Sequence, residues 1–461
     1  MPTILGANTL SSGYDVANSL RFNAADSPKL SKTISDGHDT NATFSCWFKR
    51  SKIGEAQTLF EVYEDSSNFF RVRLEADDLL QVRDMESGAN QTRLKTTQVF
   101  TDVSAWYNVV VIVDTTDGTA GDRCKIFING TRVTSFGTEV NYDQNDVIQA
   151  GVNGSSAMLG GAGANNNYLD GYIAEAVFLD GTSQAVSGFG EFDEDSPTIW
   201  KPIDVSGLTF GTNGFYLDFE NSGSLGADVS GNGNNFTVNN LTSVDQSTDT
   251  CTNNFATLNP LTNTRGTSQN FKEGNLQIDG TGSGAGASAS TISTSTSGKY
   301  YIECKIDSLG SGYAEFFAIA TSSYANHTLG YFETNTDTIL WNLDYRSGQS
   351  KIRKDGSSII TTPTSFSNGD IIGMAIDVDN GKIYFHRNGT YVNYSGTQNP
   401  SSGSNGITLP TSSDGYLIAA SVDNNSGSGT TLTMNFGSPS FSISSGNSDG
   451  NGYGNFEYSV P

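Results

Sequence analysis

Apolar and β-branched residues alternate with polar ones in short runs along most of the chain, and Gly, Asn, Asp and Ser separate the runs. No long stretch repeats apolar residues at the i, i+3, i+4, i+7 spacing of an amphipathic helix. Short alternating runs bounded by turn residues predict antiparallel strands arranged in sandwiches. The clearest runs lie at residues 42–50, 106–114, 125–130, 172–181, 299–307, 314–322, 370–379, 382–389 and 431–437.

Two features inside these runs predict local geometry. Residues 370–379 (DIIGMAIDVD) carry mostly apolar or small side chains on both alternating faces, which is typical of a central strand. Asn129-Gly130 and Asn388-Gly389 each separate two strand-like runs. Because Asn and Gly adopt the positive φ angles of a tight turn, a hairpin is predicted at both places.

The charge balance restricts the partners. Lys and Arg number 25 against 49 Asp and Glu, which gives a formal net charge of −24 at pH 7. A surface this negative disfavours nucleic acid and anionic membranes, because both repel it. No apolar run reaches the length of a membrane-spanning helix, so no membrane insertion is expected, and residues 1–15 lack the pattern of a secretory signal peptide.

The cysteines are widely spaced and include no Cys-x-x-Cys pair. Disulfide frameworks and zinc sites have characteristic short spacings that this chain lacks. We therefore expect each cysteine to be a small buried apolar residue. The four are Cys46, Cys124, Cys251 and Cys304.

Two blocks of the chain resemble known β-sandwich families. The first resembles a concanavalin A-like, laminin-G-type jelly roll in residues 19–33, 44–51, 106–116, 125–136 and 168–181. The second resembles a SPRY domain in residues 298–306, 367–389 and 431–437. The join resembles proteins of tailed bacteriophages in which a laminin-G-like domain precedes a SPRY domain in a virion fibre or appendage, and it does so at residues 190–221, 226–243 and 252–261.

The pattern and these resemblances together predict an all-β fold. Two antiparallel β-sandwich, or jelly-roll, domains are joined by a structured connector rich in Gly and Asn. The expected parts are an N-terminal anchoring segment (1–18), a laminin-G-like jelly roll (19–182), a connector with short strands (183–254), a SPRY-like sandwich (255–440) and a C-terminal tail (441–461).

Loops rich in Asn, Tyr and Gly are the candidates for ligand binding. Aromatic rings stack on the apolar faces of sugars, and amides bond their hydroxyl groups. The resemblance to SPRY domains implies binding through loops at one edge of the sandwich. Trp341 also fits a core position, and 165–167 also fits a plain loop. The candidates are Asn165, Asn166, Asn167 and Tyr168 in the first domain and Tyr324, Asn326, Trp341, Tyr345, Arg346 and Tyr391 in the second.

Calcium is the only cofactor for which the sequence offers a candidate. Asp228, Ser230, Asn232 and Asn234 place oxygen-bearing side chains at alternate positions, with Gly between some of them. Calcium takes about six to eight oxygen ligands. The string resembles one that is common in laminin-G-like domains, but it holds a single carboxylate. A loop of Asx turns is therefore the alternative interpretation.

Groups with the spacing of a catalytic site are sparse. The histidines, His38, His327 and His386, have no metal-binding spacing, and His386 is expected at the surface beside a turn. No Gly-x-Ser-x-Gly string is present. The acidic string 191–195 lacks the third carboxylate of the Glu-x-Asp-x-x-Glu set of glucan-cleaving jelly rolls, because Ser196 stands there. We therefore expect that the protein is not an enzyme.

The resemblance to phage proteins implies a virion structural protein of a tail fibre or surface appendage. It would bind host-surface glycan or receptor through the edge loops of its sandwiches. A capsid or tail decoration protein without a host ligand is the first alternative, and a polysaccharide-degrading enzyme is the second. The expected partners are other virion proteins and a host glycan, at the tail or capsid surface. A homo-oligomer is expected, with a trimer assumed because fibres are often threefold.

Overall fold

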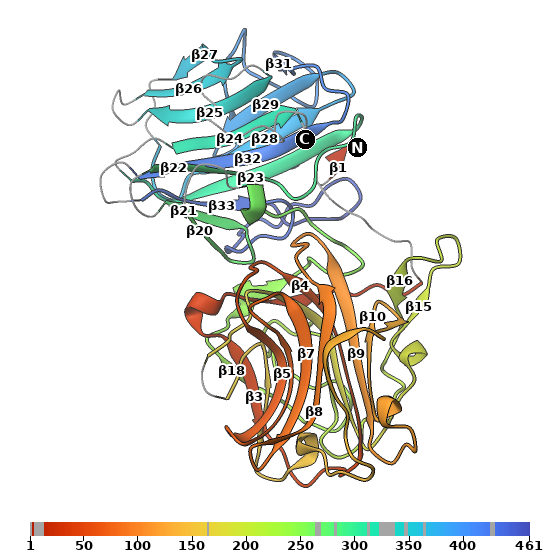
Figure 1. Ribbon diagram of the computed structural model, residues 1–461. Helices are drawn as coiled ribbons and strands as arrows, with labels where there is room; N and C mark the ends of the chain where they lie inside the picture. Colours follow the sequence, from red (N-terminus) through yellow and green to blue (C-terminus); the bar gives the residue numbers. More distant parts are fainter. Residues whose placement is uncertain are drawn as a thin grey trace. The chain divides into compact units, whose positions relative to one another are not determined.

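A computed structural model describes residues 2–3, 13–163, 166–262, 269–280, 284–310, 314–321, 337–344, 349–362, 366–424 and 429–461. These residues form strands, turns and short 3-10 helices, and none of them lies in an α-helix. The all-β prediction is confirmed. The chain divides into two compact units, which Figure 1 colours along the sequence. We call Thr9–Asn254 the N-terminal unit, and Phe255–Pro461 with Met1–Asn8 the C-terminal unit.

The N-terminal unit contains two antiparallel sheets, which we name after one central strand each. The β4 sheet has the order β11 (Thr131–Arg132), β10 (Cys124–Ile128), β9 (Trp106–Asp114), β4 (Asn41–Arg50), β14 (Gly171–Asp180), β2 (Ser19–Phe22) and β19 (Gln246–Ser247), with β17 (Phe215–Leu217) beside β14. The β7 sheet has the order β12 (Phe136–Val140), β8 (Ala89–Val99), β7 (Leu79–Glu86), β6 (Asn68–Leu74), β5 (Gln57–Asp65), β13 (Ser156–Leu159), β3 (Lys29–Thr33) and β18 (Thr237–Asn239). A small hairpin is formed by β15 (Gly190–Phe192) and β16 (Trp200–Pro202).

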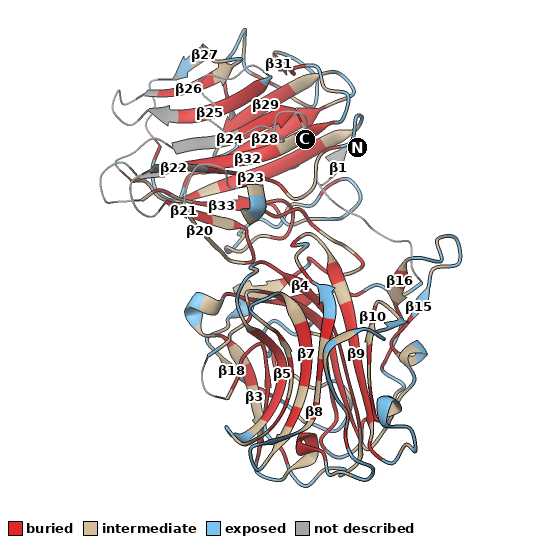
Figure 2. Ribbon diagram, viewed as in Figure 1, coloured by how far each residue is buried: buried red, intermediate tan, exposed pale blue. Residues whose placement is uncertain are grey.

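The main core of the N-terminal unit lies between its two sheets. Phe44 of the β4 sheet stacks on Phe60 of the β7 sheet, with ring centroids 4.5 Å apart. Phe178 of β14 lies 5.4 Å from Phe60 by the same measure. Figure 2 shows buried segments along these strands. Burial of apolar rings from both sheets holds the sandwich together.

Residues 183–254, predicted to be a connector, belong to the N-terminal unit. Their strands β17, β18 and β19 pair with β14, β3 and β2. Phe189 and Phe210 of this segment pack with Val110 and Ile112 of β9, whose side chains alternate with the core positions of that strand. Part of the segment therefore covers the outer face of the β4 sheet with an apolar layer, and another part, including Phe215 and Phe236, belongs to the main core.

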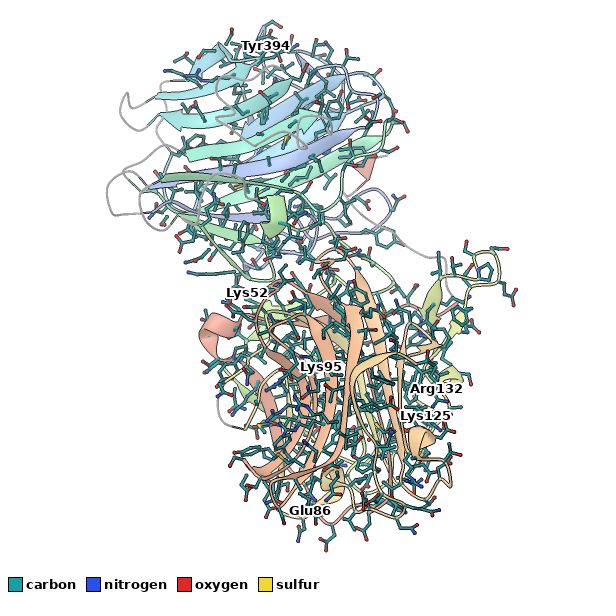
Figure 3. The ribbon with its side chains drawn as sticks, viewed as in Figure 1. Lys52, Glu86, Lys95, Lys125, Arg132 and Tyr394 are labelled. Carbon is teal, nitrogen blue, oxygen red and sulfur yellow. The ribbon has the colours of Figure 1, made fainter. Side chains whose placement is uncertain are left out.

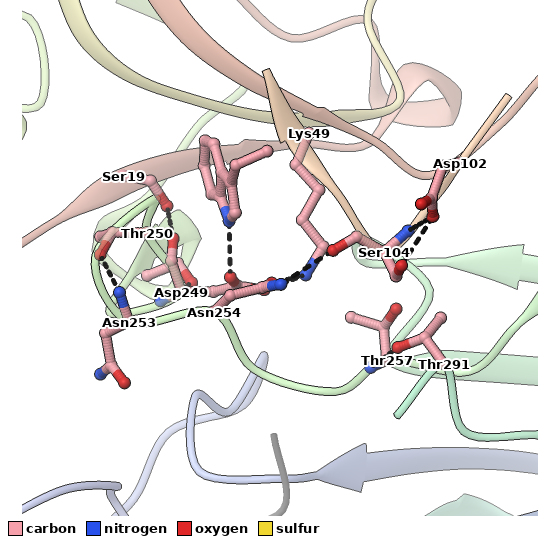
Figure 4. A network of polar contacts seen from close by, with 12 residues as sticks. Ser19, Lys49, Asp102, Ser104, Asp249, Thr250, Asn253, Asn254, Thr257 and Thr291 are labelled. Atoms are coloured by element: carbon pink, nitrogen blue, oxygen red, sulfur yellow. Dashed lines mark hydrogen bonds and ion pairs between the residues drawn. The ribbon is translucent and has the colours of Figure 1, made fainter. Parts of the chain in front are cut away.

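A buried ion pair fixes the end of this segment to β4 (Figure 4). Lys49 Nζ lies 2.8 Å from Asp249 Oδ2, and the two side chains are 1% and 2% exposed. Lys49 also donates to Asn254 Oδ1 at 2.8 Å, and Trp106 Nε1 donates to Asp249 Oδ1 at 3.0 Å. Burying two charges costs desolvation energy, which close pairing and additional hydrogen bonds offset.

Both predicted hairpins are present. Asn129-Gly130 joins β10 to β11 with φ angles of 46° and 74°. Asn388-Gly389 makes the same turn in the C-terminal unit with φ angles of 49° and 76°. In each turn the Asn Oδ1 accepts a backbone N–H of the neighbouring strand, from Asn108 at 2.7 Å and from Ile371 at 2.9 Å.

The C-terminal unit also contains two sheets. The β28 sheet has the order β20 (Gln269–Lys272), β21 (Gln277–Gly280), β33 (Thr431–Asn435), β23 (Lys299–Ser308), β28 (Ile371–Asp377), β29 (Lys382–Arg387) and β30 (Thr390–Tyr391), with β1 (Pro2–Thr3) parallel to β23 and β31 (Ile407–Thr408) beside β29. The β25 sheet has the order β22 (Gly284–Ala289), β32 (Tyr416–Asn424), β24 (Ala314–Thr321), β25 (Thr338–Asp344), β26 (Gln349–Lys354) and β27 (Ser357–Thr362). The 3-10 helices of the chain are η1 (Ala24–Asp26), η2 (Ala120–Asp122), η3 (Gln149–Gly151), η4 (Val186–Gly188), η5 (Ser243–Asp245) and η6 (Pro260–Thr262).

The predicted central strand is confirmed, because β28 pairs with both β23 and β29. Ile372 and Met374 face the core between the sheets, whereas Ala375 packs with Tyr301 and Phe456 on the other face. Residues 441–461, predicted as a tail, thus contribute Phe456 to the packing over the β28 sheet. Its side chain is fully buried.

His386 is buried, so the prediction of a surface position was wrong. Its Nε2 lies 2.7 Å from the Tyr301 hydroxyl, and its ring lies against Gly373, where a Cβ would come within 1.9 Å of Nε2. Burial lowers the pKa of His386 to about 4, so the ring is neutral at pH 7. The glycine on the paired strand gives the ring its space. The cysteines are unpaired, and all but the half-buried Cys251 are buried.

Candidate functional site

Charged and aromatic side chains form rows on the outer face of the β7 sheet. Outward positions alternate along each strand with the core positions, and strand register brings outward positions of neighbouring strands side by side. Figure 1 shows β5, β7 and β8 in this sheet, and Figure 3 labels Lys95 on it. The register gives three rows: Tyr63, Phe69 and Met85; Glu61, Arg71, Arg83 and Arg93; and Arg73, Gln81 and Lys95.

We call Arg71, Arg83 and Arg93 the arginine row. Arg71 stands directly opposite Arg83, and Arg83 directly opposite Arg93. Like charges in such positions repel and destabilise a sheet. Burial lowers the pKa of Arg83, and the nearby Arg93 and Arg71 lower it further. The row is therefore a place where positive charge is concentrated at a cost in stability.

Three of the five cations on β6, β7 and β8 have carboxylate partners. Arg71 pairs with Glu61, whose side chain is fully buried. Arg73 pairs with Glu75, and Lys95 pairs with Asp77. These pairs fix Arg71 at the β5 end of the arginine row. They also fix Arg73 and Lys95 at the two ends of the row that contains Gln81.

The other two arginines have no carboxylate partner among the described residues. Arg83 Nε donates to Asn90 Oδ1 at 2.6 Å. Arg93 Nε is buried and meets no acceptor in the described part of the chain. Both side chains are half-buried. Two guanidinium groups are thus available on this face for an external acceptor.

Phe69, which lies in the neighbouring row on the same face, contacts two guanidinium groups of the arginine row. The guanidinium carbons of Arg71 and Arg83 lie 4.2 Å and 5.5 Å from the centre of its ring. Phe69 itself is buried. Stacking of guanidinium groups on an aromatic face is attractive and restricts their orientation. The arginines are therefore held in place rather than extended into solvent.

The Asn-rich loop predicted for ligand binding borders this face. Thr58 of β5 donates its backbone N–H to the carbonyl oxygen of Asn167 at 2.9 Å. Gly163 donates its N–H to Glu61 Oε2 at 2.6 Å. A Cβ at Gly163 would come within 2.1 Å of the Tyr63 ring, so the loop packs tightly on β5 at this point.

This loop brings three of the predicted residues together at β5, the strand that pairs with the Arg71 strand β6. Asn166 is exposed, and its Oδ1 accepts a hydrogen bond from Asn167 Nδ2 at 3.0 Å. Asn167 has a φ of 58°, a conformation that Asn tolerates better than most residues. Tyr168 is half-buried against Gly161. The fourth predicted residue, Asn165, lies outside the described residues.

Two of the six candidates of the second domain lie in the described part of the chain. Trp341 is only 2% exposed and packs edge-on against Phe366 and Phe385, so its assignment as a ligand contact was wrong and its core alternative is correct. Tyr391 is half-buried, and its ring packs edge-on against His386. The remaining candidates, Tyr324, Asn326, Tyr345 and Arg346, lie outside the described residues.

The loop predicted to bind calcium has its polar groups engaged internally. Asp228 accepts hydrogen bonds from the N–H groups of Tyr216, Ser230 and Asn234, and from the Ser230 hydroxyl. Asn232 and Asn234 direct their amide nitrogens to backbone carbonyls, and Lys32 Nζ donates to Asn234 Oδ1 at 2.7 Å. No cluster of three or more His, Cys, Asp or Glu suited to a metal ion occurs within the described ranges. The calcium site stays a prediction.

The acidic string 191–195 lies in β15 and in the loop that joins β15 to β16 in the small hairpin. Lys201 of β16 lies 3.3 Å from Glu191 and 3.6 Å from Asp193. Asp193 Oδ1 also accepts the N–H groups of Asp195 and Ser196. These contacts stabilise the hairpin and the loop between its strands.

Comparison with known proteins gives a family match over part of the chain. Residues 9–185 match the concanavalin A-like lectin/glucanases superfamily, in its Laminin_G_3 family. The match includes the central strands of the β7 sheet and the loop that borders it. A comparison with curated proteins gave no match. No helix in the described part of the chain has the length and hydropathy needed to cross a membrane.

Several solved structures are similar to the chain. The SPRY domain of human HERC1 is 15% identical, with a TM-score of 0.27, over 38% of this chain and 96% of that domain. Domains LG4-5 of the mouse laminin α1 chain are 9% identical, with a TM-score of 0.31, over 94% and 92%. The CBM40 of a Ruminococcus gnavus sialidase, bound to α2,3 sialyllactose, is 14% identical, with a TM-score of 0.23, over 31% and 83%. Similarities of this size assign no function.

Proposed function

We propose that the N-terminal unit binds glycan on the outer face of its β7 sheet and does not transform it. The observation that carries the proposal is the face itself. Rows of cationic and aromatic side chains lie on a face bordered by the loop that carries the exposed Asn166 and the half-buried Tyr168, within residues that match a lectin/glucanase superfamily. Guanidinium and amide groups donate hydrogen bonds to sugar oxygens, and a tyrosine ring offers an apolar surface to the sugar ring.

The engagement of the nearby carboxylates supports binding without turnover. Glycoside hydrolysis needs a pair of carboxyl groups on either side of the scissile bond, one of them able to give up a proton. On this face Glu61, Glu75 and Asp77 each bind a cation. Glu61 also accepts the N–H of Gly163. These carboxylates position Arg71, Arg73 and Lys95.

We further propose that the protein is a structural component of a phage virion, in a tail fibre or surface appendage. The support is the resemblance of residues 190–221, 226–243 and 252–261 to the join of such proteins. Its partners are then other virion proteins and a host-surface glycan, and a homotrimer is the proposed assembly. The position of the protein in a density map of the whole virion tests the location directly.

A glycan array with the purified full-length chain tests the binding function. We expect a subset of glycans to bind, and Asn166→Ala to weaken that binding, because Asn166 is exposed in the loop that packs on β5 at the border of this face. Tyr394→Ala is the matched control, since Tyr394 is exposed in the C-terminal unit. Absence of any binding would refute the proposal and favour a decoration role without host ligand. Release of reducing ends from a bound glycan would refute binding without turnover.

A further inference from the structure

Positive charge gathers on one face of a strongly acidic protein. The chain has a net charge of −24 and only 25 Lys and Arg in total. Five of these cations lie on the outer face of β6, β7 and β8, against three carboxylates that pair with them. Because the remainder of the chain repels anions, this local excess is a specific feature of the face.

The arrangement of these cations does not serve the stability of the sheet. Alternating signs across strands would stabilise it, yet Arg71, Arg83 and Arg93 stand in direct register. Arg93 Nε is buried without an acceptor among the described residues, and a buried donor without a partner costs stability. Features that break local rules in this way are expected at functional sites.

The chemistry of the missing partner follows from the guanidinium group. Its planar N–H groups match a carboxylate or a sulfate ester through two parallel hydrogen bonds. Phe69 restricts Arg71 and Arg83 by stacking, so less conformational freedom is lost when a ligand binds. The exposed loop at Asn166 adds amide groups that suit the hydroxyls of the same ligand.

We propose that the arginine row is the anion-binding subsite for an acidic glycan, with Arg83 and Arg93 bonding its carboxylate or sulfate groups. The proposal rests on the proposed function and specifies the chemical class of glycan. Uronate-bearing and sulfated polysaccharides share the required chemistry, because both present anionic groups along a chain of sugar rings.

Binding of three oligosaccharides to the full-length protein tests this assignment. The probes are oligogalacturonate, dextran sulfate oligomers and neutral dextran oligomers, measured by isothermal titration calorimetry at low and moderate salt. We expect one or both acidic probes to bind and salt to weaken the binding. Arg93→Gln and Arg83→Gln should each weaken it about tenfold or more, since each removes a charged hydrogen-bond donor pair.

The control is Arg132→Gln. Arg132 lies in β11 of the other sheet, is more exposed, and pairs with Asp122, so its loss removes the same net charge from a different surface. We expect this variant to bind the acidic probes as the unaltered protein does. An equal loss in Arg132→Gln would overturn the proposal, because it would mean that only net charge matters.

The remaining outcomes separate this inference from the proposed function. Binding of neutral dextran that Arg83→Gln and Arg93→Gln leave unchanged would keep glycan binding and overturn the acidic subsite. Binding of no glycan of any charge, in the array and here, would overturn both. Binding of duplex DNA through the same arginines, without binding of either acidic probe, would also overturn the glycan assignment.

The melting temperature is a second readout. If Arg93 has only a structural role, Arg93→Gln should lower it, which is the opposite of what the proposal predicts. Without ligand, Arg93→Gln should leave the melting temperature unchanged or raise it by up to about 3 °C, because it relieves the repulsion with Arg83. A bound acidic probe should raise the melting temperature of the unaltered protein but not of this variant. If Arg93→Gln lowers the melting temperature sharply, the arginine is structural and the proposal fails.

Discussion

Glu175 is a buried carboxyl group whose protonation should control the stability of the N-terminal unit. It lies in β14, and its carboxylate accepts hydrogen bonds from the hydroxyls of Tyr216 at 2.9 Å and Tyr14 at 3.1 Å. Burial raises the pKa of Glu175 to about 7 against the opposing effect of these two hydroxyls, and the carboxylates of Asp218 and Glu220 raise it further.

The direction of the pH effect follows from the two pKa values. An unfolded chain releases this proton near 4.5, whereas the folded chain keeps it up to about 7. Between these values the folded state binds more protons, so the free energy of unfolding falls as pH rises, and the contribution present below pH 4.5 is lost above about 7. At about 1.4 kcal/mol for each unit of pKa, the change is about 3 kcal/mol.

Replacing Glu175 with Gln removes the ionisable group and keeps the shape of the side chain. We expect Glu175→Gln to lose about 3 kcal/mol less free energy of unfolding than the unaltered protein between pH 4.5 and pH 8. Asp84, whose pKa burial also raises to about 7, contributes equally to both proteins and cancels in the difference.

Urea unfolding at a series of pH values measures this difference through tryptophan fluorescence. Three of the four tryptophans, Trp47, Trp106 and Trp200, lie in the N-terminal unit, so its transition dominates the signal. Glu191→Gln is the control, because that side chain is 60% exposed. Parallel pH dependences in the Glu175→Gln variant and the unaltered protein would refute the reasoning.

Three further predictions concern the turns and the two units. Gly130→Ala should lower the free energy of unfolding, measured with urea, by about 1–3 kcal/mol more than Gly54→Ala does. Both glycines have a positive φ, but only at Gly130 would a Cβ meet the Trp200 ring, at 2.2 Å. Asp228→Asn should lower the melting temperature equally in calcium and in EDTA, because Asp228 holds its loop by hydrogen bonds; a melting temperature that calcium raises only in the unaltered protein would instead establish a calcium site. Glu303→Ala should make the C-terminal segment sensitive to protease, since its carboxylate accepts the N–H groups of residues 457 and 458, and an unchanged cleavage pattern would contradict this.

The parts of the fold that the sequence predicts correctly depend on local rules. A positive φ at two successive residues strongly favours Asn-Gly, so Asn129-Gly130 predicts its hairpin without any knowledge of the partner strands. Apolar residues on both faces of residues 371–377 identify β28 as a central strand, and this pattern too is local to one segment. Each of these features is determined by fewer than about a dozen neighbouring residues.

The positions that the sequence misplaces depend on residues far along the chain. His386 reads as a surface residue beside a turn, yet Gly373 on the paired strand and the Tyr301 hydroxyl make a buried place for it. Residues 183–254 read as a connector because their strands are short. Part of this segment folds onto the β4 sheet because that sheet carries apolar residues such as Val110 and Ile112 on its outer face as well.

The arginine row is formed by the pairing register of three strands, so no single segment of the sequence predicts it. Arg71, Arg83 and Arg93 each occupy an outward position that reads as an ordinary solvent-facing residue of an amphipathic strand. They stand opposite one another only in the observed pairing of β6, β7 and β8. A shift of β7 by one residue would turn Arg83 into the core and Asp84 outward.

Asp84 is therefore the inward counterpart of the row. It is fully buried, and its Oδ2 accepts hydrogen bonds from the Tyr142 hydroxyl at 2.8 Å and the Gln149 N–H at 3.0 Å. Those bonds can form only when β7 presents Asp84 to the interior, which is the register that presents Arg83 to the outer face. The same strand pairing thus gives a buried carboxyl group two hydrogen bonds on one side of the sheet and brings three guanidinium groups together on the other, so a change at Asp84 that lets β7 shift would disperse the proposed anion site without altering any residue in it.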